Sequence, residues 1–513
     1  MNAGNNAGNH VNRKAVALAT LMVAVVAGCS HDSAAHTAVS NGGQAAPAPA
    51  HVHTPSPALP EMADAPAFGA VSKLVNDAIA ADKLPGAVIE IGHGGAVALH
   101  QAYGLRKHAG EAGLDGRPSP AEPMTEDTIF DLASLTKNLV TATAVMQLYE
   151  QGKVRFDDPA QQYLPDFNPS NDPRRAKVTI RMLLTHTSGE PGDVELKDPW
   201  GLNGPDKAEG LRRALGTPLQ SGPGDGFRYS DINFILLGEL VEKASGEALD
   251  VYAQQHIFDP LGMDDTRFLP AARACGPHAT YGSAIAWAPG AGQLPTTCPA
   301  GTWNTGLLPR IAPTARDEEG RADPGKNPDL DHLLRGTVHD TTARRMGGVA
   351  GHAGVFSTAR DVSVFAQALL DRLAGRPSQF PLQQATLAMM TSPQQPGHTP
   401  QQVEAADQAA RKALAQRPSN THSLLAARYP AIAGQNLRGF GWDIDTGQSA
   451  PRGAVFPVGS FGHTGFTGTS LWMDPASDTY IVLLSNSIHT RGSPPMSNLR
   501  GEVATAAARA LGL

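Results

Sequence analysis

The residue pair with the clearest chemical potential is Ser134 and Lys137, in the run Ser-Leu-Thr-Lys. Apolar residues recur at helical spacing over 134–151, which predicts an amphipathic helix beginning at the serine. Positions three residues apart share one helix face, so the lysine amine can reach the serine hydroxyl. A lysine that is partly desolvated beside cationic neighbours has a lowered pKa and can take the serine proton. The pair therefore indicates a nucleophilic serine, although Ser-x-x-Lys alone more often marks a solvated helix start.

Two later segments place further reactive side chains beside glycine-rich or apolar stretches. A Tyr-Ser-Asp run at 229–231 precedes an apolar helix, and a His-Thr-Gly run at 463–465 precedes a strand-like segment. Taken singly, the first is typical of a helix-capping turn and the second of a glycine-rich strand. Their joint occurrence with the serine–lysine pair, in this order, is what gives them meaning.

The three runs together resemble the motifs of the serine penicillin-recognising superfamily. It comprises low-molecular-weight penicillin-binding proteins, class C β-lactamases and family VIII esterases. Supporting segments are similar as well, and the last two resemble a subset that includes penicillin-binding protein 4B-type lipoproteins. These segments are 183–189 (LLTHTSG), 260–263 (PLGM), 335–340 (RGTVHD) and 347–358 (GGVAGHAGVFST). The resemblance covers roughly residues 66–513.

The resemblance implies a role for each motif residue. Ser134 is the expected nucleophile, Lys137 its proton acceptor, and Tyr229 the group that passes the proton to the leaving group. The backbone amides of Ser134 and Phe466 are expected to form the oxyanion hole, where one donor contributes roughly 3 kcal/mol.

Two residues depart from the pattern of most relatives. Asp231 stands where many carry Asn, and an ionised carboxylate cannot donate a hydrogen bond to a substrate carbonyl. Pairing with Lys137 would also raise the lysine pKa and weaken it as a base, which argues against β-lactam hydrolysis. His463, ahead of Thr464 and Gly465, replaces the lysine of most β-lactamases; such a histidine is shared with secreted D-Ala-D-Ala peptidases and some esterases. Its plainest role is to hydrogen-bond the motif tyrosine.

The elements that must position these residues predict an α+β fold. Two β-rich runs, 87–91 and 96–100, surround a glycine turn and indicate a hairpin. A buried strand over 481–484 and a helix over 502–511 close the chain. Further helices are expected over 232–244 and 249–258. We therefore expect a β-lactamase/penicillin-binding-protein-like antiparallel sheet built from both chain ends and flanked by helices, plus a mostly helical subdomain. Polar insertions are expected near 191–226, 270–330 and 395–437.

Composition and missing motifs exclude several other classes. The 513 residues carry 41 Lys+Arg against 48 Asp+Glu, without a basic block, which argues against a nucleic-acid partner. No Gly-x-Ser-x-Gly elbow, zincin motif or P-loop is completed. Serine acyl transfer requires neither a metal nor a cofactor, and we expect none.

The amino-terminal residues predict an export and anchoring signal. An apolar run over 15–26 follows two cations and is shorter than the about 20 residues that span a bilayer. It ends in Val-Ala-Gly-Cys, which resembles the bacterial lipobox and implies lipid attachment at Cys29 after removal of 1–28. Residues 29–65 are expected to form a flexible tether to the 66–513 domain. The predicted location is periplasmic, anchored to the outer membrane; an ordinary signal peptide with a chance cysteine is the alternative.

Four further residues have structural interpretations. Cys275 and Cys298 lie in a Gly/Pro/Ala-rich stretch, where a disulfide is plausible in an oxidising compartment and two free thiols are the alternative. His339 and His352 could shape the substrate mouth, but histidines satisfied by the backbone are the favoured interpretation.

The sequence therefore predicts a serine hydrolase that acts through an acyl-enzyme on Ser134. By family analogy, the expected substrate is a peptidoglycan peptide ending in D-Ala. A β-lactamase or carboxylesterase with the same residues is the close alternative, and a binding protein that acylates without turnover is the alternative from another class.

Overall fold

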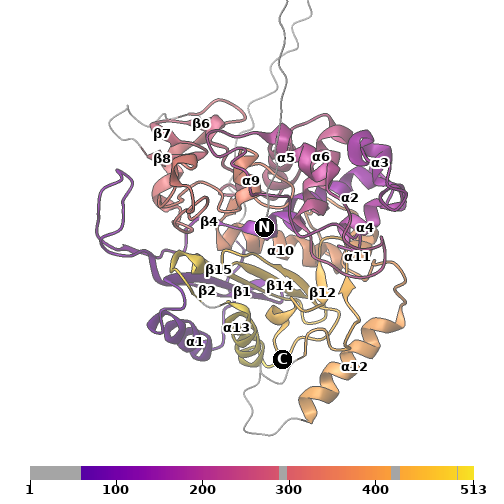
Figure 1. Cartoon of the computed structure of the whole chain (residues 1–513). Helices are drawn as coiled ribbons and strands as arrows, with labels where there is room; N and C mark the ends of the chain where they lie inside the picture. The colour runs from indigo at the N-terminus through magenta and orange to yellow at the C-terminus, as the bar shows by residue number, and fades with distance from the viewer. Residues whose placement is uncertain (1–58, 288–296, 417–427, 494) are drawn as a thin grey trace, which may run out of the picture. The chain divides into compact units, whose positions relative to one another are not determined.

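The centre of the fold is an eight-stranded antiparallel sheet in the order β11-β12-β13-β14-β15-β1-β2-β3 (Figure 1). The computed structural model describes residues 59–287, 297–416, 428–493 and 495–513. Strands from the two chain ends meet where β1 pairs with β15, with Ile89 opposite Leu483. This confirms the expected α+β fold. The strands are β1 (Gly86–His93), β2 (Ala96–Lys107), β3 (Glu122–Pro123), β11 (Leu437–Arg438), β12 (Asp443–Asp445), β13 (Phe461–Thr464), β14 (Ser470–Asp474) and β15 (Thr479–Ser485).

Both faces of this sheet are covered, which explains the unbroken apolar runs in its central strands. In β1, Ile89 and Ile91 point into a core shared with α1 (Gly69–Ala80) and α13 (Ser497–Ala510). Val88 points to the opposite face, into the larger core that includes α10 (Ala359–Leu373). The hairpin, the strand near 481–484 and the closing helix are thus confirmed, with the helix starting five residues earlier than expected.

A mostly helical region covers the second face and contains the Ser-Leu-Thr-Lys and Tyr-Ser-Asp motifs, whereas the His-Thr-Gly motif lies at the end of β13 in the sheet. Its best-buried member is α6, whose apolar residues point into the core on all sides. The helices are α2 (Thr143–Glu150), α3 (Ala160–Tyr163), α4 (Ile180–Leu184), α5 (Lys207–Gly216), α6 (Asp231–Ser245), α7 (Leu249–Ala253), α8 (Asp259–Leu261), α9 (Thr341–Arg345), α11 (Gln384–Met390) and α12 (Gln401–Ala415). No helix in the described ranges has both the length and the apolar character needed to cross a bilayer.

The helix expected over 134–151 is not one regular helix. It begins as a 3₁₀ turn (Ala133–Leu135), continues as a π-helical stretch (Lys137–Ala142) and becomes α-helical only in α2. The Thr143 hydroxyl stabilises the wide turn by donating to the carbonyl oxygen of Asn138, five residues earlier, at 2.8 Å. Hydrophobic periodicity does not distinguish these helix types, and π-turns are common at functional sites.

Short strands occupy the connections between the major elements. A three-stranded sheet joins β4 (Phe130–Asp131), β10 (Val355–Ser357) and β5 (Arg267–Phe268), and β4 leads directly to Ser134. The segments expected as insertions contain secondary structure of their own. Residues 191–226 contain α5, and 395–437 contain the largely exposed α12. Residues 270–330 contain β6 (Ala274–Cys275), β7 (His278–Tyr281), β8 (Ala284–Trp287) and β9 (Trp303–Asn304).

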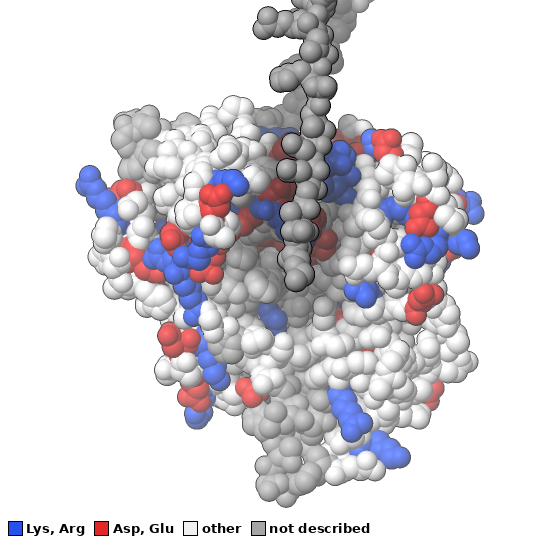
Figure 2. Space-filling view, in the orientation of Figure 1, with Lys and Arg blue, Asp and Glu red and all other residues white. Residues whose placement is uncertain are grey.

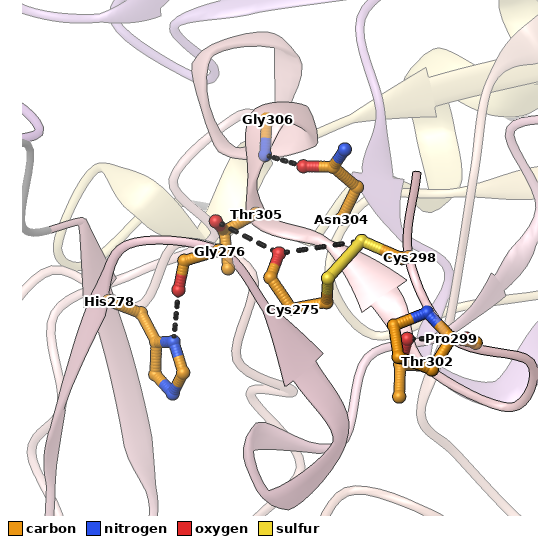
Figure 3. The surroundings of a disulfide bond; sticks show 9 residues. All are labelled: Cys275, Gly276, His278, Cys298, Pro299, Thr302, Asn304, Thr305 and Gly306. Carbon is orange, nitrogen blue, oxygen red and sulfur yellow. Dashed lines mark hydrogen bonds between the residues drawn. A yellow bond between two sulfur atoms is a disulfide. The ribbon is translucent and has the colours of Figure 1, made fainter. Parts of the chain in front are cut away.

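Cys275 and Cys298 are joined by a disulfide bond, with their Cα atoms 5.9 Å apart (Figure 3). The bond closes the loop that contains β7 and β8. The expected signal segment 1–28, Cys29 and the tether as far as residue 58 lie outside the described residues. On the face seen in Figure 2, cationic and acidic side chains are interspersed over the surface.

Candidate active site

Ser134 follows β4 through a turn that one buried carboxylate stabilises. Ala133 has a φ of 48°, a left-handed conformation that costs a non-glycine residue of order 1 kcal/mol or more. Asp131 Oδ1 accepts a hydrogen bond from the Ala133 amide at 2.9 Å, and its Oδ2 accepts one from the His339 amide at 2.7 Å. Burial raises the pKa of Asp131 to about 6. The Asp131 carboxylate thus connects the Ala133–Ser134 turn to the segment that contains His339.

Lys137 is fully buried, and its ammonium group has an acceptor for each of its three protons. Nζ lies 2.9 Å from Ser134 Oγ, 2.9 Å from the His352 carbonyl oxygen and 2.6 Å from Asp231 Oδ1. The Ser134–Lys137 contact is the one that the three-residue spacing predicts. A lysine amine that contacts three oxygen atoms, one of them in a carboxylate, is positioned as a cation.

The electrostatics of Lys137 differ from the expectation of a lowered pKa. Burial alone would lower the lysine pKa, but the Asp231 carboxylate and the Tyr229 hydroxyl outweigh it, so the pKa is raised above its usual value. The expectation of a lowered pKa was therefore wrong. The structure instead contains the Lys137–Asp231 pairing that the Asp-for-Asn departure made conceivable.

Tyr229 lies against both members of the pair. Its side chain is within hydrogen-bonding reach of Ser134 and Lys137, and its ring centroid is 5.1 Å from Lys137 Nζ. Burial raises the pKa of Tyr229 despite the nearby lysine. The hydroxyl therefore keeps its proton at neutral pH and can donate it.

His186 packs against the Tyr229 ring. No role for this histidine was predicted from the sequence. Its ring stacks on the Tyr229 ring, with centroids 4.4 Å apart and planes at 28°. Nδ1 accepts hydrogen bonds from the Ser230 amide and from Asn233 Nδ2, both at 3.2 Å. Burial lowers the pKa of His186 well below its usual value, so the ring is neutral. The only sequence signal for His186 is its place in the LLTHTSG segment. In the structure its backbone has a φ of 57°, in the left-handed region.

His463 lies on β13 and faces the same tyrosine. Its Nδ1 donates to the Thr464 carbonyl oxygen at 2.8 Å, and its ring centroid is 6.0 Å from that of Tyr229. Burial lowers the pKa of His463 well below its usual value. Its Nε2 has no hydrogen-bond partner within the described part of the chain, so it does not bond the tyrosine hydroxyl directly. A neutral acceptor nitrogen therefore stands where most β-lactamases have a cation.

Gly465 lets the turn after β13 pack directly on the segment that leads to Ser134. A Cβ at this position would lie 2.4 Å from the Leu132 carbonyl oxygen and 2.1 Å from Thr469 Oγ1. The Thr469 hydroxyl bonds that same carbonyl at 3.0 Å, and Arg500 Nη2 donates to the Gly465 carbonyl oxygen at 2.7 Å. This packing holds the next residue, Phe466, beside the serine segment.

His352 is held by a carboxylate rather than by the backbone, contrary to the favoured interpretation. Its Nε2 lies 2.8 Å from Asp340 Oδ1. Burial opposes both charges, but their mutual attraction prevails: the pKa of Asp340 is lowered and that of His352 is raised. The resulting ion pair fixes the loop whose carbonyl oxygen binds Lys137. His339 instead stacks on the Phe466 ring, with centroids 5.9 Å apart.

These contacts bring Ser134, Lys137, Tyr229, Asp231 and His463 into one cluster, in which Lys137 and His463 are buried and the other three are partly exposed. A serine in contact with a buried lysine and a tyrosine, beneath a glycine-rich strand turn, defines a serine hydrolase. The chain belongs to the Beta-lactamase family, whose model matches residues 71–504.

Curated relatives share most of the chain. A protein of Escherichia coli K12 named "Putative D-alanyl-D-alanine carboxypeptidase" is 29% identical over 414 residues, which is 78% of each chain. The N-acetylmuramyl-L-alanine amidase of Bacillus subtilis is 29% identical over 437 residues, 83% of this chain and 82% of that one. Among solved structures, simvastatin synthase from Aspergillus terreus has the same fold, with a TM-score of 0.56, 22% identity and coverage of 86% and 97%.

Proposed function

We propose that this protein is a D-alanyl-D-alanine carboxypeptidase-like enzyme that acts on peptidoglycan peptides through an acyl-enzyme on Ser134. The observation that carries the proposal is the direct contact of Lys137 Nζ with Ser134 Oγ at 2.9 Å, with Tyr229 in reach of both. The substrate class is supported by the relative named for this activity and by the histidine that opens the third motif.

The proposed reaction begins with the deprotonation of Lys137. The lysine rests as an ammonium paired with Asp231, so the reacting form is the fraction that has lost one proton to solvent, and its free amine takes the proton of Ser134. Oγ forms a bond to the carbonyl carbon of the penultimate D-alanine. The amides of Ser134 and Phe466 are the donors for the oxyanion.

Collapse of this intermediate breaks the C–N bond. Tyr229 donates its hydroxyl proton to the leaving amine nitrogen and regains one from Lys137, which thereby returns to the free amine. D-alanine leaves and the acyl group remains esterified to Ser134. Water adds to the ester carbonyl in the second half-reaction, gives up a proton through the same residues and regenerates the serine.

Two measurements test the proposal. D-alanine release from a peptide ending in D-Ala-D-Ala is expected from the purified protein and is expected to be absent in Ser134→Ala. Intact mass after exposure to benzylpenicillin is expected to show one adduct, also absent in the variant. An adduct without D-alanine release would point to a binding protein, and consumption of the drug without an adduct to a β-lactamase. No adduct and no peptide turnover would favour an esterase.

We also propose that the protein is a periplasmic lipoprotein anchored through Cys29. The support is the Val-Ala-Gly-Cys run after a short apolar segment. Cys29→Ala is expected to move the protein from the membrane fraction to the soluble fraction. Retention of the variant in the membrane fraction would overturn the anchor.

A further inference from the structure

Arg500, on α13, contacts the turn between β13 and β14, which contains the expected oxyanion donor Phe466. Its Nη2 donates to the Gly465 carbonyl oxygen at 2.7 Å and to the Thr469 carbonyl oxygen at 2.9 Å. The Gly465 amide also donates to the Thr469 carbonyl oxygen, at 2.8 Å. The guanidinium therefore bridges the first and last residues of the 465–469 turn.

Two hydroxyl groups of the same turn hold it against the segment that leads to Ser134. The Thr467 hydroxyl donates to the Asp131 carbonyl oxygen at 2.7 Å, and the Thr469 hydroxyl donates to the Leu132 carbonyl oxygen at 3.0 Å. Because the turn is fixed to residues just before the serine, any shift of the turn changes its position relative to the Ser134 hydroxyl.

Arg500 is anchored on the other face of the sheet. Leu499 and Val503, its neighbours on α13, pack in the core that α13 shares with α1, whereas Leu132 packs in the larger core on the opposite face. Figure 1 shows α13 on the other side of the sheet from the helical region. Arg500 is 9% exposed. Its contacts thus support the turn from the face away from Ser134.

Arg500 is also a buried cation without a carboxylate partner in the described part of the chain. Burial is the only influence that shifts its pKa, which falls to about 10, so the guanidinium is protonated at neutral pH. A buried charge without a counter-ion is destabilising unless hydrogen bonds compensate it. The retention of such a charge against the 465–469 turn indicates a role there beyond stability.

The chemistry of the peptide group connects this charge to the oxyanion. The Gly465 carbonyl and the Phe466 N–H belong to one planar, delocalised peptide group. A hydrogen bond from a cation to the carbonyl oxygen withdraws electron density from the nitrogen, which makes the N–H a stronger donor. The contact also fixes the plane of the peptide and so the direction of the N–H. His463, which opens the same motif, is neutral and adds no positive charge.

We infer that Arg500 is a positioning residue for acyl transfer, which orients the Phe466 amide toward the developing oxyanion and strengthens it as a donor. The inference rests on the acyl-enzyme chemistry of the proposed function, but not on the identity of the substrate. When Ser134 Oγ bonds to the carbonyl carbon, negative charge develops on the carbonyl oxygen. A cation one peptide group away stabilises this charge more than the neutral ground state, so its effect belongs to kcat rather than to KM.

The test compares Arg500→Gln, which removes the charge, with Arg500→Lys, which retains it. The readouts are kcat and KM for p-nitrophenyl acetate, and the Kd of phenylboronic acid, which forms an anionic tetrahedral adduct with a serine. Arg500→Gln is expected to lower kcat by about 10- to 100-fold and to keep KM within about twofold, because a weakened oxyanion donor costs less than a lost one. The Kd of the boronate should rise by a similar factor. Arg500→Lys should recover most of both losses.

Val503→Ala is the matched control for folding, because Val503 is buried in the core one turn further along α13. It is expected to lower the thermal midpoint and to leave kcat and the boronate Kd unchanged. The inference is overturned if Arg500→Gln retains the wild-type kcat, or if Val503→Ala loses as much activity as Arg500→Gln. Equal losses in Arg500→Gln and Arg500→Lys would overturn the role of the charge.

The pH dependence of Arg500→Lys tests the charge even where Arg500→Gln does not fold. Burial lowers the pKa of a lysine far more readily into the working range than that of an arginine. The ratio of kcat in Arg500→Lys to that of the wild type should therefore fall as pH rises from about 6 to about 10. A constant ratio would overturn the inference. An Arg500-dependent esterase that releases no D-alanine would keep the inference and lose the peptidase proposal. A wild-type protein that neither hydrolyses the ester nor binds the boronate would overturn both.

Discussion

Lys137 Nζ and Asp231 Oδ1 lie 2.6 Å apart in a site where the lysine is completely buried. The ion pair keeps Lys137 protonated at rest, although Lys137 is the residue that is expected to accept the proton of Ser134. Activity therefore depends on how readily the Lys137 ammonium loses a proton while it is paired with Asp231. An Asn at position 231 would leave the lysine without this charged partner.

Replacing Asp231 by Asn should increase the fraction of Lys137 that is present as the free amine. The raised pKa of Lys137 means that the free amine accumulates only as pH rises toward that pKa. Removing the carboxylate lowers the pKa, so the rising limb of kcat/KM against pH is expected to shift to lower pH. At pH 7 the rate should increase by about tenfold for each unit of pKa lost. Ester hydrolysis measured from pH 5 to 10 checks this, with Asp231→Glu as the charge-retaining control. An unmoved limb would exclude Lys137 as the titrating base.

Gly465→Ala should damage catalysis far more than folding. The new methyl group would meet the Leu132 carbonyl oxygen at 2.4 Å, which pushes the turn and the Phe466 amide away from Ser134. Loss of one oxyanion donor lowers kcat by about 100- to 1000-fold. The matched control is Gly447→Ala, where a Cβ meets nothing within 4 Å. Single-turnover acylation and thermal unfolding of both variants measure the two effects. Full activity in Gly465→Ala would show that the turn does not position the oxyanion.

His186→Ala should affect both stability and the protonation of Tyr229. The variant loses the ring stack on Tyr229 and leaves the Ser230 amide and the Asn233 side chain without their acceptor. These losses predict a decrease of about 2–3 kcal/mol in the free energy of unfolding. His186→Asn, which tolerates positive φ and retains an acceptor, should recover part of it. Urea titration measures the free energy of unfolding of both variants. In a profile of kcat against pH, the alkaline limb should shift only if the substitution has moved Tyr229.

Asp361 should make the protein less stable as pH rises. Burial raises the pKa of Asp361, on α10, to about 7, against about 3.9 in an unfolded chain. Its folded form favours the protonated state, so the stabilisation is complete below about pH 4 and is lost as pH rises through about 7. Asp361→Asn mimics the protonated carboxyl, and its free energy of unfolding should decline less between pH 5 and 8 than that of the wild type. Parallel slopes in urea titrations across this range would contradict the assignment.

Local patterns predicted the elements of the fold better than the contacts within the site. The hairpin at 87–100 and the strand near 481–484 follow from alternation and turn residues, which act over a few positions. The Ser134–Lys137 contact also follows from helical spacing, because both residues lie within one turn.

Contacts between distant segments could not be derived in the same way. His352 meets Lys137 across 215 positions in the chain, and Arg344 pairs with Asp317 only because α9 packs against the 315–319 segment. The sequence left the sign of the Lys137 pKa shift open, because that sign depends on the distance to Asp231, 94 positions away. Nothing in the local sequence encodes that distance.

The pairing of β1 with β15 also determines when activity can first arise during synthesis. The Ser134 segment is held by Gly465 and Thr469, and β15 and α13 follow almost at the carboxyl terminus. A growing chain therefore carries its nucleophile for more than three hundred residues before the strand that must lie over it has been made. The nascent chain is thus expected to stay inactive until β13 has been made, and any truncation before β13 removes the strand turn that contains the expected oxyanion donor Phe466.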